Sequence, residues 1–207
     1  MKIVKLLVVM GFYIGFYANA QSVTPQKKWL NDTISFKAKK LQQLYLLSTA
    51  VSVYESDNYK QQFFYEFPKT FKLFNELYGY DNIRNKPGPL STKALEHINL
   101  FNGLVNINDS IYYKKIVSIA IGGLWDEDAV GFFQEGLRSR VLTNPKLTVY
   151  ILKTMNDIKI RSFWLFYFDG PVVRKQISEP LQTIKEINSR IYNLMIEGHE
   201  DALKLDK

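Results

Sequence analysis

The chain has 207 residues, of which 46% are hydrophobic, 14% aromatic and 23% charged, with a formal net charge of +7 and no cysteine. This balance is typical of a globular protein and excludes a disordered chain, while the missing cysteine excludes disulfides, a thiolate nucleophile and zinc–thiolate sites. A chain of this length can bury one sizeable core, so we expect a single domain.

Residues 1–20 have the pattern of a secretory signal peptide. Lys2 and Lys5 form a positive start, residues 6–17 are uncharged and mostly apolar, and Ala18-Asn19-Ala20 offers small residues to a signal peptidase. A retained membrane anchor is the alternative, but the uncharged stretch turns polar too early to span a bilayer comfortably. We therefore expect cleavage after Ala20, export to a periplasm or the extracellular medium, and a soluble mature chain, 21–207, without a transmembrane segment.

Helix signals begin soon after this segment. Apolar residues recur every three or four positions from Asp32 or Thr33 to about Tyr54, which predicts a long first helix. A polar turn is expected over 55–58, and Pro68 divides the next stretch into a helix that ends at Glu66 and another that begins at Pro68. Gly79 suits a left-handed C-terminal cap, and residues 81–89 have the composition of a loop within the domain.

Further helix starts are expected near residues 91, 109, 126 and 145, which are 17 to 19 positions apart. Arg138 and Arg140 would lie near the C-terminal end of the helix that begins near Asp126, where positive charge complements the helix dipole. Residues 147–168 fit either two helices or a β-hairpin; we favour two helices because Asn144-Pro145 is a helix start. Ser178 is expected to begin the last and longest helix.

This spacing predicts helix pairs that recur about every 35 residues, as in stacked α-hairpins of the solenoid kind. No residue signature repeats with that period. The predicted fold class is therefore all-α, as a single-domain irregular helical array or bundle over residues 21–207, or as stacked α-hairpins, with about seven to nine helices.

Histidine is scarce, and this limits the possible chemistry. His97 and His199 are the only two histidines, and no Gly-x-Ser-x-Gly motif is present. A Ser-His-Asp triad and a histidine-rich zinc site are therefore not expected. The sequence indicates no catalytic residue, no metal site and no cofactor motif.

Paired carboxylates remain the one enzymatic alternative. A glycosidase that cleaves cell-wall glycan needs two carboxyl groups about 5–10 Å apart, one of them with a raised pKa. The candidate acids are Glu66, Asp126, Glu135 and Asp169. No spacing selects a pair among them, and each can equally be a surface acid.

Aromatic residues gather in two groups, the first over 63–74 and the second over 163–168. Such groups usually form core, yet rings on every side of a helix can also open onto a binding groove. Trp125, just before a helix start, could anchor an interface, where tryptophan is enriched. The residues expected to contact a partner are Trp125, Trp164, Tyr167 and Asp169.

Removal of Lys2 and Lys5 leaves 25 Lys and Arg against 20 Asp and Glu, a net charge of +5. The basic residues form no continuous run, so nucleic acid is not an expected partner. The favoured hypothesis is an exported non-catalytic binding protein, in one form an inhibitor or immunity-type protein, whose partner is a protein with an acidic surface or an envelope glycan. The alternatives are a helical cell-wall glycan hydrolase and an envelope scaffold protein.

Overall fold

The computed structural model describes residues 25–50, 53–81, 85–126, 128–173 and 175–205. The expected signal peptide therefore lies outside the described residues. Within them the chain is an all-α helical array, as expected, and the β-structure described is one two-stranded antiparallel sheet. Nine of the described helices have eight or more residues, namely α1 to α8 and α11, and nine is the upper end of the expected range.

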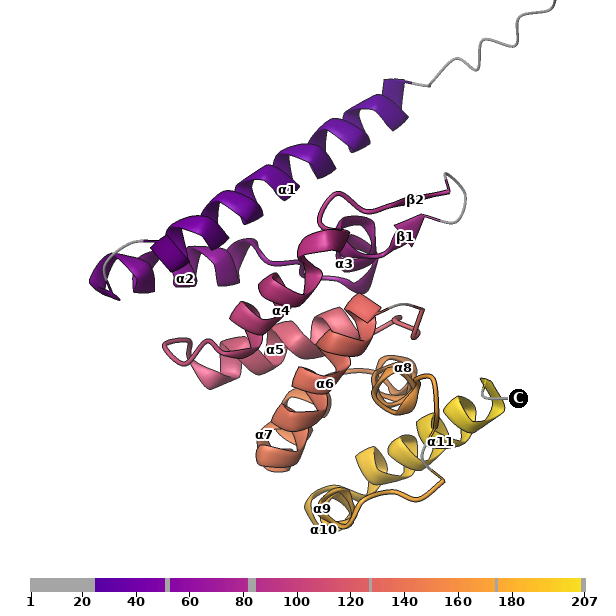
Figure 1. Ribbon diagram of the computed structural model, residues 1–207. Coiled ribbons are helices and arrows are strands. Elements are labelled where there is room, and N and C mark those ends of the chain that lie inside the picture. The colour runs from indigo at the N-terminus through magenta and orange to yellow at the C-terminus, as the bar shows by residue number, and fades with distance from the viewer. Residues whose placement is uncertain (1–24, 51–52, 82–84, 127, 174, 206–207) are drawn as a thin grey trace, which may run out of the picture.

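In chain order, the elements are α1 (Pro25–Ala50), α2 (Val53–Glu66), α3 (Phe71–Tyr78), β1 (Tyr80–Asp81), β2 (Lys86–Pro87), the 3-10 helix η1 (Ser91–Lys93), α4 (Ala94–Asn102), α5 (Asp109–Ala120), α6 (Asp128–Thr143), α7 (Pro145–Leu152), α8 (Asp157–Phe168), α9 (Glu179–Gln182), α10 (Ile184–Ile187) and α11 (Ser189–Leu205). Figure 1 shows that α1 and α2 form a helical hairpin at one end of the array, whereas α11 lies at the other end. The α1–α2 and α8–α11 pairs make the most extensive helix contacts, and α3 to α7 connect them.

Several expected boundaries were wrong; among them, α3 begins at Phe71 and not at Pro68. The first helix begins at Pro25, well before Asp32, and the expected turn over 55–58 lies inside α2. There the Ser56 hydroxyl is buried and donates to the carbonyl oxygen of Ser48 (2.6 Å), so a residue with turn propensity is satisfied by the facing helix. The last helix is interrupted at Thr183 and again at Asn188, whose side chain accepts from the amide of Ile191 and caps α11; the longest helix is α1.

Gly79 and the loop after it also differ from expectation. Gly79 has φ −86°, so it is not in the left-handed region. A β-carbon there would lie 1.8 Å from Oδ1 of Asn75, so close approach explains the glycine. The expected loop contains the short β1–β2 pair, in which Tyr80 lies opposite Pro87.

The region 147–168 forms helices, and the hairpin alternative is excluded. Asn144 caps α7 by accepting from the amide of Leu147 (3.0 Å), and Asn156 caps α8 by accepting from that of Lys159 (3.0 Å). These side chains satisfy amides that a helix start leaves without a partner, which outweighs the strand propensity of the β-branched and aromatic residues between them.

Both aromatic groups contribute to one continuous core. Phe67 and Phe101 stack with ring centroids 4.1 Å apart, and Phe133 joins the cluster from α6. Within the first group, Tyr65 faces outward and is 56% exposed. The fully buried members of the two groups are Phe63, Phe64, Phe67, Phe74, Phe163, Trp164 and Phe166.

Positively charged side chains cap the C-terminal ends of helices other than their own. Lys115 of α5 donates to the carbonyl oxygens of Phe64 and Tyr65 (3.3 Å to the latter), at the end of α2. Arg140 of α6 donates to those of Asn102 and Leu104 (3.0 and 3.2 Å), at the end of α4. These cations satisfy carbonyl groups that a helix end leaves unpaired, and they complement the negative end of the helix dipole.

Side chains of α6 also donate hydrogen bonds to carbonyl oxygens at the end of α8. Arg138 donates to the carbonyl oxygens of Tyr167 (2.9 Å) and Asp169 (2.7 Å), and the buried Gln134 donates to those of Phe166 (2.6 Å) and Asp169 (3.0 Å). Arg140 lies in the last turn of α6, as expected, and in addition Arg138 and Arg140 donate to carbonyl oxygens at the ends of neighbouring helices.

Candidate functional site

Trp164 and Tyr167, two of the four residues expected to contact a partner, lie in the core. Trp164 is 0% and Tyr167 5% exposed. A β-carbon on Gly198 of α11 would lie 2.7 Å from Cβ of Trp164, so α8 and α11 approach each other closely there. Rings at this depth stabilise the α8–α11 pair and offer no surface to a partner. The candidate site does not include them.

The other two residues, Trp125 and Asp169, are joined to each other. Asp169 follows α8 and is 6% exposed; its Oδ2 accepts from the backbone amide of Trp125 (2.6 Å) and its Oδ1 from that of Gly170 (2.9 Å). The α5–α6 loop is held at a second point, where the Gly122 amide donates to the Ser162 hydroxyl (2.8 Å). Asp169 therefore positions the loop that carries the partly exposed Trp125.

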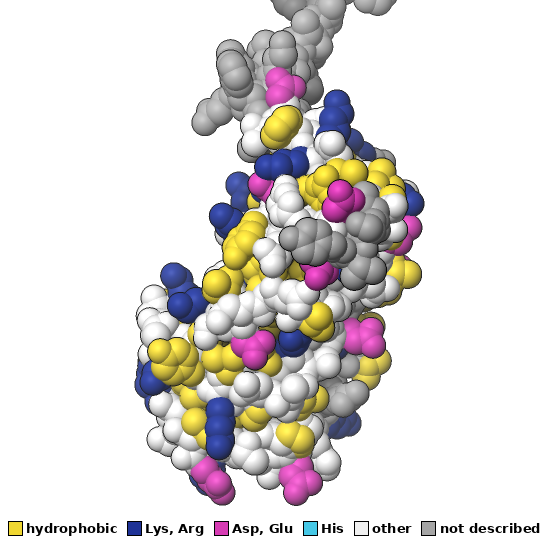
Figure 2. Space-filling view, turned by 90° about the vertical axis from the view of Figure 1, so that its left-hand side faces the viewer, with side chains coloured by type: hydrophobic (Ala, Val, Ile, Leu, Met, Phe, Trp, Pro, Cys, Tyr) yellow, Lys and Arg dark blue, Asp and Glu magenta, His cyan; other side chains and the backbone are white. Residues whose placement is uncertain are grey.

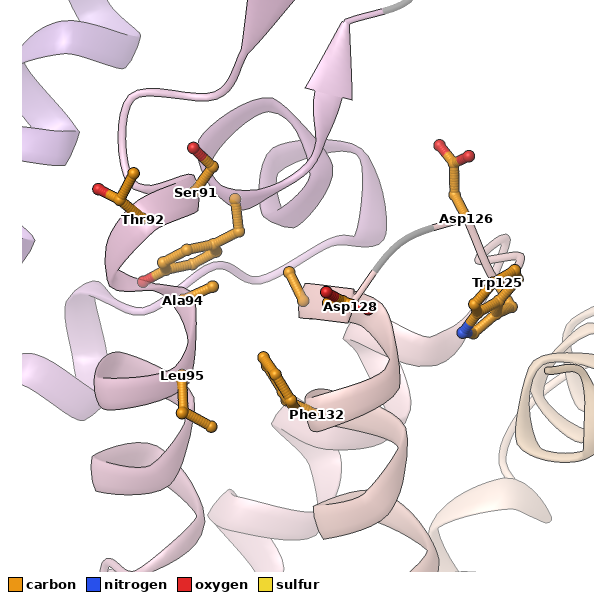
Figure 3. Close-up of a pocket in the computed structure, with 10 residues that line it drawn as sticks. Ser91, Thr92, Ala94, Leu95, Trp125, Asp126, Asp128 and Phe132 are labelled. Atoms are coloured by element: carbon orange, nitrogen blue, oxygen red, sulfur yellow. The ribbon is translucent and has the colours of Figure 1, made fainter. Parts of the chain in front are cut away.

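Beside this loop, a cleft of about 460 Å³ opens between α4 and α6. Figure 3 shows Ser91, Thr92 and Leu95 on one side of it and Asp128 and Phe132 on the other. Its complete lining is Tyr78, Ser91, Thr92, Ala94, Leu95, Trp125, Asp126, Asp128, Ala129 and Phe132. Leu95 is 48% exposed, so the cleft offers an accessible apolar surface.

The charged residues of the lining are both acidic. Asp126 and Asp128 are exposed, and among the described residues neither forms an ion pair with Lys or Arg. Lys93, which follows the two hydroxyl residues Ser91 and Thr92, is bound to Glu96 (3.1 Å). The cleft thus combines apolar walls with uncompensated negative charge.

A neutral pair of polar groups lies at the inner side of the cleft. The Tyr78 hydroxyl is 3.1 Å from Nδ1 of His97, and the two residues are 1% and 0% exposed. Burial raises the pKa of Tyr78 far above its usual range and lowers the pKa of His97 to about 4. At neutral pH both groups are therefore uncharged, so the charge of the cleft comes from its two aspartates.

The four carboxylates considered for glycan hydrolysis do not meet in this cleft, because Asp126 is the only one of the four that lines it. Glu66 binds Lys40 (2.6 Å) and Lys37 (3.6 Å); the hydrogen bond from Lys40 lowers its pKa, whereas a general acid needs a raised one. Asp169 is buried as an acceptor for backbone amides, and Glu135 is exposed on α6. The sequence placed Asp128 at the start of a helix and Leu95 within one, and assigned neither to a binding site, because each has an ordinary place in a helix.

A smaller cavity of about 240 Å³ lies between α2 and the segment after α4. Its polar groups satisfy one another: Asp57 accepts from Nδ2 of Asn106 (2.9 Å) and pairs with Lys60 (3.5 Å). Because these charges are already compensated, the cleft between α4 and α6 is the better candidate site.

In the part of the chain that the structure describes, no three side chains of the metal-binding types gather closely enough to hold an ion. Nor does any described helix have the length and apolar character needed to cross a membrane. Comparisons of the chain with protein-family models, with curated proteins and with solved structures find no match.

Proposed function

We propose that this chain is an exported, non-catalytic binding protein that receives a segment of another protein in the cleft between α4 and α6. One observation carries the proposal: a half-exposed leucine, Leu95, lies across an open cleft from Phe132. An accessible apolar cleft with a few polar groups at its edge is the usual form of a site for a protein or peptide ligand.

The scaffold around the cleft is suited to binding because it is preorganised. Asp169 and Ser162 hold the α5–α6 loop through two backbone amides, and Gln134 and Arg138 tie α6 to the end of α8. A rigid wall loses little conformational freedom when a ligand binds, so more of the contact energy appears as affinity.

The partner would be another secreted or envelope protein, and an inhibitor or immunity-type role is one form of this function. The net charge of the chain favours an acidic partner, and an envelope glycan is the other expected ligand. The cleft itself, however, carries negative charge, so the part of the partner that enters it should be apolar or basic.

The test is capture from the envelope and secreted fractions of the source organism, with a matched pair of variants. Leu95→Glu places a charge in the cleft, whereas Leu46→Glu changes a leucine of similar exposure (54%) on α1. We expect the unaltered chain and L46E to capture the same near-stoichiometric partner and L95E to lose it, with the circular dichroism spectra of all three unchanged.

Equal capture by L95E and L46E would contradict the assignment of the cleft. Retention on purified peptidoglycan with release of soluble glycan would instead favour the hydrolase alternative. Weak capture of many proteins with no dominant partner, unaffected by L95E, would favour an envelope scaffold.

A further inference from the structure

The cleft between α4 and α6 has an apolar part and a polar end. Leu95 and Phe132 lie on facing helices, and the small side chains of Ala94 and Ala129 leave space between these helices. At the start of α6, Asp128 adds a carboxylate to the wall. A side chain with an apolar stem and a positive head has the matching distribution of groups.

The polar end offers acceptors that are not used within the protein. Asp128 has no ion-pair partner among the described residues, and the hydroxyls of Ser91 and Thr92, on the opposite wall, make no hydrogen bond with any described residue. Asp126 lies at the rim with its carboxylate directed away from the walls, and it adds to the negative potential. The Asp128 carboxylate can accept hydrogen bonds from a lysine ammonium group and compensate its charge.

Resting on the proposed function, we infer that the cleft binds a lysine side chain of the partner protein. The aliphatic stem lies between Leu95 and Phe132, and the ammonium group is bound at the Asp128 carboxylate. The two aspartates of the lining favour a basic ligand through charge complementarity, although the chain as a whole is basic.

The experiment uses the full chain, purified in the form that its host leaves after processing, and two short peptides. Acetyl-Ala-Lys-Ala-amide is compared with the same peptide carrying norleucine, which keeps the stem and lacks the charge. Binding is followed by chemical-shift changes of backbone amides in 91–95 and 128–132 at low salt. We expect the lysine peptide to bind about two- to fivefold more tightly, which is the range for a solvent-exposed ion pair.

The variant Asp128→Asn should abolish this preference, and so should about 0.5 M salt, which screens exposed charges. Asp109→Asn is the matched control, because Asp109 occupies the first turn of α5 as Asp128 occupies that of α6. D109N should keep the preference, so a general effect on helix dipoles is separated from binding in the cleft.

Equal affinity for the two peptides, or a preference that survives in D128N, would overturn the inference and leave an apolar binding cleft in place. The absence of shifts in 91–95 and 128–132 with either peptide would overturn it as well. The proposed function fails separately, when L95E captures the partner as well as L46E does.

Discussion

His97 should make the protein lose stability in mild acid. Its ring is fully buried among Tyr45, Phe63 and Tyr78, with centroid distances of 4.9, 5.4 and 5.9 Å. Nδ1 has the Tyr78 hydroxyl as a partner, whereas Nε2 has no hydrogen-bond partner. Protonation would therefore bury a positive charge and an unpaired N–H group, and this burial lowers the pKa of His97 to about 4, from 6.5.

The sign and size of the effect follow from these two pKa values. Between pH 6.5 and about 4 the unfolded chain binds the proton and the folded chain does not, so the free energy of unfolding falls as the pH is lowered through this window. The expected loss is about 2 kcal/mol at pH 5 and about 3 kcal/mol at pH 4 and below. Above pH 6.5 His97 contributes no pH dependence.

Urea unfolding followed by circular dichroism at pH 7, 6 and 5 measures this loss. Hydrogen bonds from Lys40 and Arg161 lower the pKa values of Glu66 and Asp201, so the stability that these two carboxylates provide is lost mainly below pH 5. The measured pH range therefore excludes most of their titration.

The variant His97→Phe keeps a ring in the cluster and cannot titrate. At pH 7 it should be about 1 kcal/mol less stable than the unaltered chain through the missing Tyr78 hydrogen bond. It should lack the fall of about 2 kcal/mol between pH 7 and 5, so that at pH 5 it is the more stable of the two. His199→Phe, at the chain's only other histidine, shows which histidine carries the slope. An unchanged slope in H97F, or a flat profile in the unaltered chain, would refute the reasoning.

Three further predictions concern helix packing. Lys115→Met should lower the free energy of unfolding by about 1–3 kcal/mol in urea unfolding at pH 7, because two carbonyl groups at the end of α2 lose their donor; an unchanged midpoint would show that water replaces the ammonium group. Gly198→Ala should also destabilise, by about 1–3 kcal/mol, since a β-carbon would lie 2.8 Å from the backbone nitrogen of Leu165. Gly131→Ala, in the interior of α6 with its nearest contact at 3.7 Å, should instead raise the melting temperature slightly, and a loss there would contradict the argument.

Helix boundaries could be predicted from the sequence where the residues that fix them lie within one turn of each other. Asn144 followed by Pro145 marks the start of α7, because the cap and the fixed φ of proline act within one turn. The break in the last segment was missed although Asn188 caps α11 in the same way. Its apolar rhythm continues from 181 to 195 across the break, and periodicity alone does not distinguish one helix from several short ones that keep the same face buried.

The candidate site was harder to predict because it depends on contacts between distant residues. Trp125 was found from its position before a helix start, but nothing in the sequence links it to Asp169, 44 residues later, which holds its loop. Trp164 and Tyr167 were wrongly predicted to lie at the surface. A high density of aromatic residues does not distinguish a groove from a core, and these two rings are buried because α11 packs against α8.

The basic balance of the chain shows why net charge is a weak guide to a partner. On the face drawn in Figure 2, Lys and Arg side chains are scattered among acidic and hydrophobic ones. Arg138 and Arg140 direct their charge to helix ends inside the array, where it compensates the partial negative charge of carbonyl groups. Lys115 does the same when it is protonated, but burial lowers its pKa to about 7. These cations contribute to the net charge of +7 but present less positive charge to a partner than the same residues would on a solvated face. The cleft, in contrast, has two exposed aspartates without compensation, so its local potential is opposite in sign to the charge of the whole chain. A ligand in contact with the cleft experiences that local potential, because more distant charges are screened within about 8 Å in physiological salt.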